Sequence, residues 1–143
     1  MTFSFGESER ERIEVDVLRY ERKPAGEYHD DNWLTVRISV QAGGFRGSFD
    51  AAIVTDELVT FMNQVRPLFE TLHGSAEFTT TEDQVHMRLV GDGKGHIELD
   101  GEVMDEPGTG NQLNFILRFD QSQLGRSMHE LEKVIAGFPV RKP

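Results

Sequence analysis

"QVHMRLVGDGKGHIELDGEV", residues 84–103, holds two runs of alternating apolar and polar residues around a glycine-rich segment. Alternation with a period of two places successive side chains on opposite faces of a β-strand. The glycines at 91–95 suit a tight connection between two such strands. The stretch therefore predicts an antiparallel hairpin with one buried and one wet face. The carboxylates on the wet side of its second strand are Glu98, Asp100 and Glu102.

The glycine-rich segment does not fit two ligand loops that it resembles in composition. In a calcium loop starting at Asp92, Lys94 and His96 would stand where oxygen ligands are needed. A phosphate loop leads into a helix and carries a Lys followed by Ser or Thr, whereas Gly95 leads into an alternating strand. The segment is thus predicted to be a turn.

Similar alternation recurs along the chain, bounded by glycine, proline and acidic residues. Gly43 and Gly44 separate two of these runs and predict a further hairpin. With the two runs already quoted, the predicted strands number seven. The other five cover residues 12–20, 33–41, 45–53, 75–81 and 111–119.

Two segments change to a period of three and four residues, which predicts amphipathic helices at about 55–72 and 120–136. Thr55 or Asp56 can cap the first, and Asp120 or Ser122 the second. Pro67 removes a backbone donor late in the first helix, so we expect it to kink or end the regular part.

The sequence predicts an α+β fold, in which an antiparallel sheet of about seven strands has two helices packed on one face. The other face stays open to solvent, because nearly every strand is apolar on one side only. A length of 143 residues fits a single domain, 1–143. The predicted core includes Val36, Ile38, Phe49, Phe61, Val65, Leu89, Phe115, Leu117 and Leu131.

Charge and composition limit the possible partners. The chain has 25 acidic and 15 basic residues, a net charge of −10 that repels nucleic acid and attracts basic partners. It has no cysteine, which suits a reducing compartment. The N-terminus has no signal-peptide pattern, and no stretch approaches the roughly 20 apolar residues of a membrane span. We therefore expect a cytoplasmic protein.

Five histidines do not form any of the spacings typical of metal or catalytic motifs. His86 and His96, with Glu98 and Asp100 nearby, are the one arrangement that could hold a metal or move protons. A solvated strand face explains them more simply. We assign no catalytic, cofactor-binding or metal-binding residue, and we predict a protein without enzymatic activity or cofactor.

Acidic charge is concentrated between residues 92 and 106, where six acids accompany a single lysine. The acids of residues 96–103 line one side of one strand, a geometry suited to lysines and arginines of another protein. Taken alone, the pattern also fits a solvated strand. The candidate partner-binding residues are Glu98, Asp100, Glu102 and Asp105.

Four segments together resemble the small bacterial WapI-type immunity proteins, over about residues 33–141. They are "GGFRGSFDAAI" (43–53), "GDGKGHIELDGEV" (91–103), "GNQLNFILRFDQSQL" (110–124) and "FPVR" (138–141). The resemblance implies a protein that binds and neutralises the C-terminal domain of a contact-dependent toxin, in the best-known case a tRNA-cleaving nuclease. It carries over no site residue. The alternatives are a housekeeping or small-ligand-binding domain of the same fold and, third, a small hydrolase.

Overall fold

The alternating runs form two antiparallel sheets of four strands each in the computed structural model, which describes residues 1–142. The strands of each sheet follow one another in chain order, so each sheet is a meander. The first sheet contains β1 (Thr2–Ser8), β2 (Glu11–Tyr20), β3 (Trp33–Ala42) and β4 (Phe45–Val54). The second contains β5 (His73–Phe78), β6 (Val85–Asp92), β7 (His96–Met104) and β8 (Gln112–Asp120).

Each sheet is followed by a helix of 17 residues, so the chain repeats one plan twice. These helices are α2 (Thr55–Thr71) and α3 (Gln121–Gly137). A single-turn helix, α1 (Tyr28–Asp31), lies in the connection between β2 and β3. The helix α3 begins with a capping box, because Asp120 accepts hydrogen bonds from the amides of Ser122 and Gln123.

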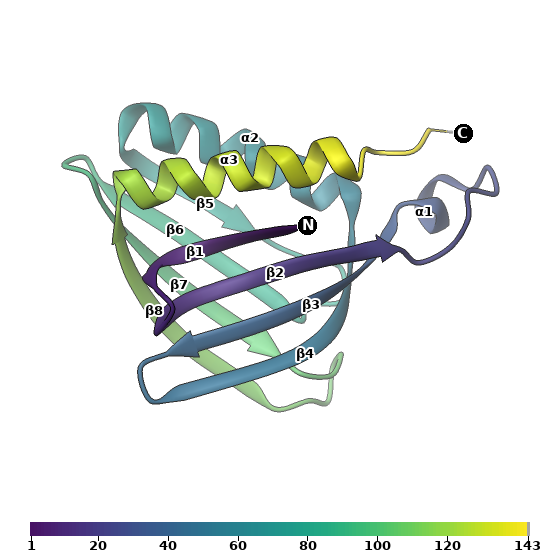
Figure 1. Ribbon diagram of the computed structural model, residues 1–143, viewed down its shortest axis with the longest axis horizontal. Helices are drawn as coiled ribbons and strands as arrows, with labels where there is room; N and C mark the ends of the chain where they lie inside the picture. The colour runs from purple at the N-terminus through teal and green to yellow at the C-terminus, as the bar shows by residue number, and fades with distance from the viewer. Residues whose placement is uncertain (143) are drawn as a thin grey trace.

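The two sheets face each other and enclose the core between their apolar sides (Figure 1). Figure 1 shows the β1–β4 sheet in front of the β5–β8 sheet, with α2 and α3 side by side along the top. Phe61 of α2 connects the two layers, since its ring centroid lies 5.7 Å from that of Phe5 in β1 and 5.0 Å from that of Phe78 in β5. One continuous hydrophobic cluster therefore serves both sheets and the helices.

The predicted fold class, α+β with antiparallel strands, is confirmed. The strand count and layering differ from the expected sheet of about seven strands with helices on one face. The eighth strand is β1, whose Phe3 and Phe5 are fully buried. In place of one sheet with an open side, two sheets cover each other's apolar faces. A strand that is apolar on one side can be covered either by helices or by a second sheet. The alternating pattern therefore does not distinguish the two folds.

The predicted elements are otherwise close to those observed. Both long helices begin and end within one residue of their expected bounds. Pro67 does not end the first helix, because the helix continues for a further turn to Thr71. The first helix uses neither expected cap: Glu57 accepts the amide of Val54. Of the predicted core residues all are buried except Phe49, which is half-buried at the rim. Among residues 1–142, no helix is long and apolar enough to cross a membrane.

Candidate functional site

The acidic strip of Glu98, Asp100 and Glu102 lies on the outer side of β7, as its alternation predicts. Ile97, Leu99 and Val103 face the core, while Glu98 and Asp100 are exposed and Glu102 is half-buried. The strand β7 is an interior strand, paired with β6 on one side and β8 on the other. The strip therefore runs along the middle of the outer face of the second sheet, and we call this surface the acidic face.

Arginines on the neighbouring strands reduce the net charge of the acidic face. Arg88 of β6 lies opposite Asp100, and Arg118 of β8 lies opposite Glu98. The Arg118 Nη2 atom is 3.5 Å from Glu98 Oε1, and both side chains are largely in solvent. An exposed pair of this length is weak, so either group can be redirected to a partner at little cost. The net negative charge of this surface is thus smaller than the run of acids in the sequence indicates.

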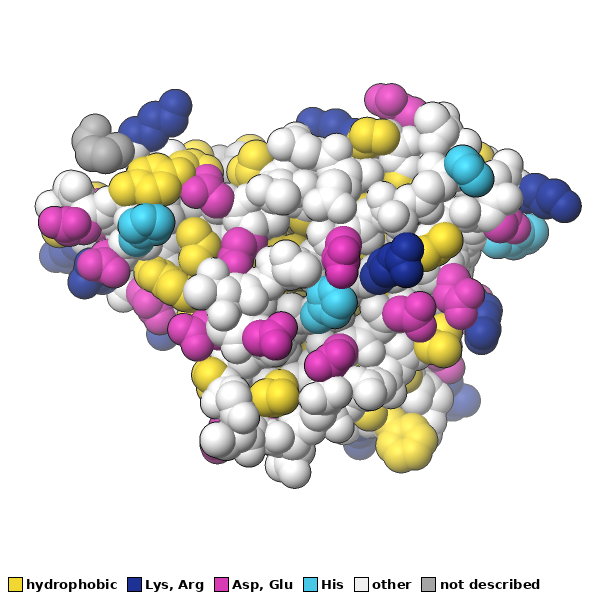
Figure 2. All heavy atoms as spheres, turned by 180° about the vertical axis from the view of Figure 1, so that it is seen from behind, with side chains coloured by type: hydrophobic (Ala, Val, Ile, Leu, Met, Phe, Trp, Pro, Cys, Tyr) yellow, Lys and Arg dark blue, Asp and Glu magenta, His cyan; other side chains and the backbone are white. Residues whose placement is uncertain are grey.

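Two exposed apolar side chains flank the acidic strip. Val90 of β6 lies opposite Glu98, and Ile116 of β8 lies opposite Asp100. Val90 is 38% exposed and Ile116 is 46% exposed. Seen from behind the view of Figure 1, aspartate and glutamate side chains spread across the middle of the molecule (Figure 2). Apolar contacts beside mixed charges are the usual composition of a non-obligate protein interface.

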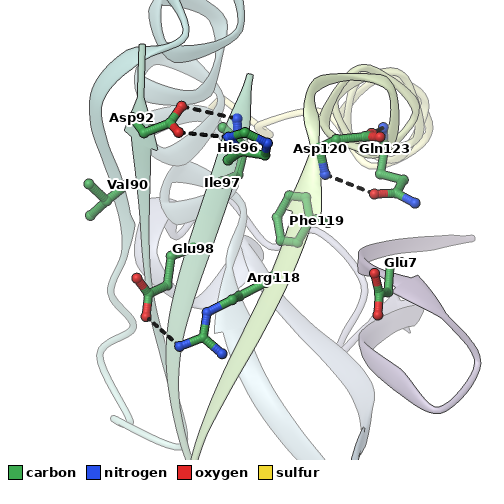
Figure 3. A pocket seen from close by; sticks show the side chains of 11 residues that line it. Glu7, Val90, Asp92, His96, Ile97, Glu98, Arg118, Phe119, Asp120 and Gln123 are labelled. Atoms are coloured by element: carbon green, nitrogen blue, oxygen red, sulfur yellow. Dashed lines mark hydrogen bonds and ion pairs between the residues drawn. The ribbon is translucent and has the colours of Figure 1, made fainter. Parts of the chain in front are cut away.

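A hollow of about 530 Å³ opens at one end of the acidic face (Figure 3). Its lining brings together Glu98, Arg118 and Val90 of the second sheet and Glu7 at the end of β1. Figure 3 shows Glu98 and Arg118 pointing toward one another and Glu7 on the far side of the hollow. A second hollow of about 630 Å³ has Gly101, Asp100 and Glu102 in its lining. Both are open to solvent and could receive basic side chains.

A further carboxylate in the lining of the first hollow, that of Asp92, serves the local structure. Asp92 closes the Gly93–Gly95 turn, because it accepts the amides of Lys94 and His96 at 2.7 and 3.1 Å. Its other oxygen lies 2.7 Å from Nδ1 of His96. These hydrogen bonds, that to the His96 ring first, lower the pKa of Asp92 to about 2. The predicted glycine turn is confirmed, and Asp92 is the residue that shapes it.

Asp105, the fourth candidate partner-binding residue, lies away from the strip, in the loop between β7 and β8. Its Oδ1 atom accepts the Asn111 amide at 2.7 Å, and its Oδ2 atom accepts the Asn111 side chain at 3.1 Å. These bonds lower the pKa of Asp105. Its carboxylate thus holds the ends of the loop together.

The two histidines considered for a metal or proton-transfer site occupy different places. His86 Nε2 lies 2.6 Å from Oε1 of Glu77 on β5, and His96 interacts with Asp92 at the opposite end of the hairpin. In the part of the chain that the structure describes, no three His, Asp or Glu side chains are grouped as metal ligands. The arrangement of His86, His96, Glu98 and Asp100 is therefore not assembled.

Sequence reasoning missed Glu7, Val90 and Ile116 as parts of this surface. Val90 and Ile116 are apolar residues on the otherwise polar sides of their strands. This break in the alternation is visible in the sequence and indicates exposed apolar side chains. They become neighbours of Glu98 and Asp100 only through the strand register. Glu7 comes from the strand that the prediction omitted.

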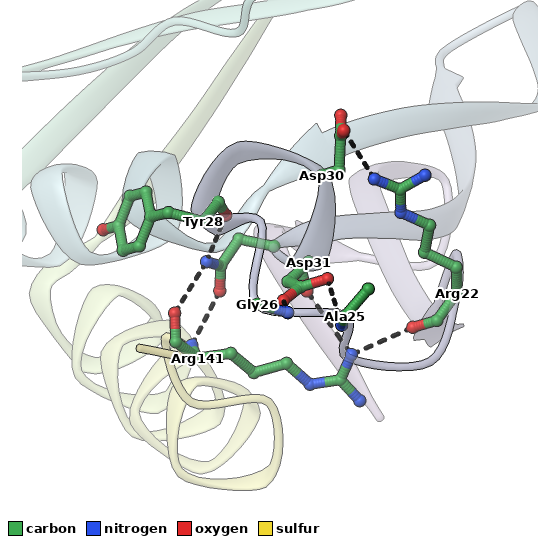
Figure 4. Close-up of polar contacts among 8 residues, drawn as sticks. Arg22, Ala25, Gly26, Tyr28, Asp30, Asp31 and Arg141 are labelled. Carbon is green, nitrogen blue, oxygen red and sulfur yellow. Dashed lines mark hydrogen bonds and ion pairs between the residues drawn. The ribbon is translucent and has the colours of Figure 1, made fainter. Parts of the chain in front are cut away.

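A second group of polar contacts connects Arg141 to the segment around α1 (Figure 4) and fixes the C-terminal segment instead of forming a binding site. The side chain of buried Asn32 donates to the carbonyls of Tyr28 and Arg141, and it accepts from the Arg141 amide and the Thr55 hydroxyl. The Arg141 guanidinium stacks on the Tyr20 ring, 3.5 Å from its centroid. All hydrogen-bonding groups of Asn32 are used internally, so the residue has none left for a ligand.

Comparison with solved structures shows a similar fold in a plant protein. A structure of the plant transcriptional regulator PBF-2 superposes with a TM-score of 0.53 at 11% sequence identity, covering 96% of this chain and 81% of that one. WHY1 from Arabidopsis thaliana gives a TM-score of 0.49 at 13% identity, covering 96% and 90% of the two chains. At such low identity, the likeness to PBF-2 concerns the fold alone.

No curated protein sequence matches the chain significantly. The model of the immunity protein WapI-like family matches residues 4–139, nearly the whole length. The match begins within β1 and includes β2 to β8 and both long helices. The chain belongs to the WapI-like immunity protein family.

Proposed function

We propose that this protein is an immunity protein that binds a basic toxin domain through the acidic face and blocks it without catalysis. Membership of the family supports a protein partner in general. The observation that carries the choice of surface is the strip of Glu98, Asp100 and Glu102, with apolar Val90 and Ile116 beside it. Carboxylates on a solvent-facing strand contribute little to folding, so they are free to meet a partner's cations.

The acidic face suits a nuclease-like toxin domain in particular. A domain that acts on nucleic acid presents a positively charged cleft to it. Carboxylates of an inhibitor that occupy this cleft speed the encounter and exclude the substrate. The two hollows beside the strip can take lysine or arginine side chains, while Val90 and Ile116 supply apolar contact.

The test is the association rate with the toxin domain encoded next to this gene, measured at low and moderate salt. Reversing two charges of the strip, Glu98→Lys with Asp100→Lys, should slow association and flatten its salt dependence, because steering depends on charge and is screened by salt. The fold should persist, since both side chains are exposed. A matched control is Glu21→Lys with Glu27→Lys, two exposed acids near α1, which changes the net charge equally.

Equal rates in the two double variants would exclude the acidic face as the docking surface. Toxin titration separates blocking from catalysis: inhibition by binding ends at one immunity protein per toxin domain. Lasting inactivation of a molar excess of toxin would contradict the non-enzymatic function. Absence of any binding or protection by the wild-type protein would contradict the immunity function itself.

A further inference from the structure

The outer sides of β6, β7 and β8 present the same three kinds of side chain in two neighbouring rows. Each row has a carboxylate on β7, an exposed apolar residue on one neighbouring strand and an arginine on the other. In the order β6, β7, β8, the first row is Val90–Glu98–Arg118 and the second row is Arg88–Asp100–Ile116. The second row thus repeats the first in reverse order, and the two arginines lie diagonally across the pair of carboxylates. Figure 3 shows the first row, with Val90 and Arg118 on either side of Glu98.

Each row lines one of the two hollows of the acidic face. The first row lines the hollow of about 530 Å³, and the second row lines the hollow of about 630 Å³. A partner side chain that enters either hollow therefore meets an arginine as well as a carboxylate.

The two arginines have little or no engagement with the carboxylates beside them. Arg88 lies opposite a carboxylate on each side, Glu77 of β5 and Asp100 of β7, and within residues 1–142 it forms an ion pair with neither. Arg118 has the exposed contact of 3.5 Å with Glu98. Both arginine side chains are exposed, so both guanidinium groups are available to a carboxylate from outside the chain.

The spacing of the strands means that a partner meets both signs of charge together. Neighbouring strands lie about 4.8 Å apart. Salt screens charges over a longer distance, about 8 Å at physiological ionic strength. A cation that docks over the strip therefore also lies in the field of an arginine. A uniformly basic surface would cover both arginines with like charge, which weakens binding, whereas a carboxylate over each arginine removes this cost.

We propose that the toxin domain places a carboxylate over each of Arg88 and Arg118 while its cations contact Glu98 and Asp100, so that the two arginines determine partner specificity. The fitting surface has alternating charge, in contrast to the uniformly basic surface of a general polycation. The inference rests on the proposed function, because it describes the partner of the same face.

Removing the arginines tests the inference by the sign of the effect. If they only reduce the negative charge of the face, their loss makes the face more acidic and tightens the binding of a basic domain. If they hold carboxylates of the partner, their loss weakens the binding.

The experiment measures the dissociation constant for the toxin domain encoded next to this gene by calorimetry. Arg88→Gln with Arg118→Gln should bind about tenfold more weakly than wild type, because two ion pairs across the interface are lost. Arg88→Lys with Arg118→Lys should lose less, since the charge remains. The matched control is Arg46→Gln with Arg126→Gln, two exposed arginines outside the acidic face, which changes the net charge equally and should not weaken binding.

A lysine homopolymer is the probe for a uniformly basic surface. It has no side-chain carboxylate to meet the arginines, so Arg88→Gln with Arg118→Gln should bind it more tightly than wild type does. Circular dichroism checks that each variant is folded, which we expect because both side chains are exposed.

Toxin binding by the glutamine variant that equals or exceeds that of wild type overturns the inference. If Glu98→Lys with Asp100→Lys still weakens binding in that case, the proposed function stands. Weaker binding of the lysine homopolymer also overturns the inference, since the loss is then not specific to the toxin domain. A wild type that does not bind the toxin domain, or a strip variant that binds it as wild type does, contradicts the proposed function or its docking surface and this inference with it.

Discussion

The ring of Phe115 occupies the space that a side chain at position 101 would need, and residue 101 is a glycine. The two residues are directly opposite on β8 and β7, and a Cβ atom on Gly101 would lie 2.2–2.7 Å from three ring atoms. The ring covers the glycine backbone and closes the core beneath the middle of the acidic face. We expect this pair to be strongly coupled, because a side chain at position 101 and the ring at position 115 would occupy the same space.

Gly101→Ala should lower the free energy of unfolding by about 1–3 kcal/mol through overpacking. Phe115→Ala should lower it by about 3–5 kcal/mol through loss of a buried ring. In the Phe115→Ala background the added methyl group no longer meets a ring, so Gly101→Ala should cost far less there. Urea unfolding of the two single variants and the double variant measures this coupling. Additive losses would show that the ring moves aside freely.

For single residues, the sequence predicts side-chain direction and burial correctly where these depend on one strand alone. The outward direction of Glu98, Asp100 and Glu102 and the burial of Phe115 follow from alternation within a strand. Asp105 has the same charge and a nearby position, yet its role depends on a loop closure that composition does not encode. Phe45 follows the apolar side of β4 in the sequence but is exposed. Its strand extends beyond the cover of the opposite sheet, which local pattern cannot show.

Among the elements, α2 acts as a substitute strand for the edge of β5. The side-chain Nε2 atom of Gln64 donates to the backbone carbonyl of Glu77 at 3.2 Å, and its Oε1 atom accepts from the backbone amide of Glu77 at 2.9 Å. The two bonds imitate the pair of backbone hydrogen bonds that a neighbouring strand would make. This contact satisfies backbone groups that would otherwise attract another chain. A helix can therefore protect a sheet edge with one suitably placed side chain.

Gln64→Ala should speed hydrogen exchange at the Glu77 amide and lower the free energy of unfolding by about 1–3 kcal/mol, because two hydrogen bonds of about 0.5–1.5 kcal/mol each are lost. Gln64→Glu is the comparison variant, because it keeps the acceptor for the Glu77 amide while it replaces the donor to the Glu77 carbonyl with a charged carboxylate oxygen. Its Glu77 amide should stay protected. Exchange as slow in Gln64→Ala as in wild type would mean that another group covers this edge.

Element prediction succeeded for long periodic segments and failed where signals were short. The helices have well-spaced apolar residues over four turns or more, and their bounds were correct. The strand β1 offers only Phe3 and Phe5 before charged residues begin, and it was overlooked although both rings are fully buried. Its position beside β8 and under α3 comes from contacts more than 100 residues apart in the chain.

At the level of the whole molecule, the chain uses one plan twice and places the two halves face to face. Sequence alternation defines which side of each strand is apolar but not what covers it, so it could not separate a single sheet under helices from two sheets in contact. The same ambiguity concealed the first hollow at the end of the acidic face, because its lining combines strands of one half with Glu7 of the other. The apolar sides of both halves are buried in one shared hydrophobic cluster.

The last prediction is that both halves unfold together, as a single domain. Phe61 contacts Phe5 of the first sheet and Phe78 of the second, within one hydrophobic cluster. Trp33, the only tryptophan, reports on the first sheet by fluorescence, while the ring protons of His86 and His96 report on the second by NMR. Urea transitions from these probes should coincide. Phe61→Leu should shift both to lower urea by the same amount, whereas exposed Arg126→Glu should leave them in place. Separate midpoints, or a shift of only one probe in Phe61→Leu, would show that the halves are independent units and that the shared core does not couple them.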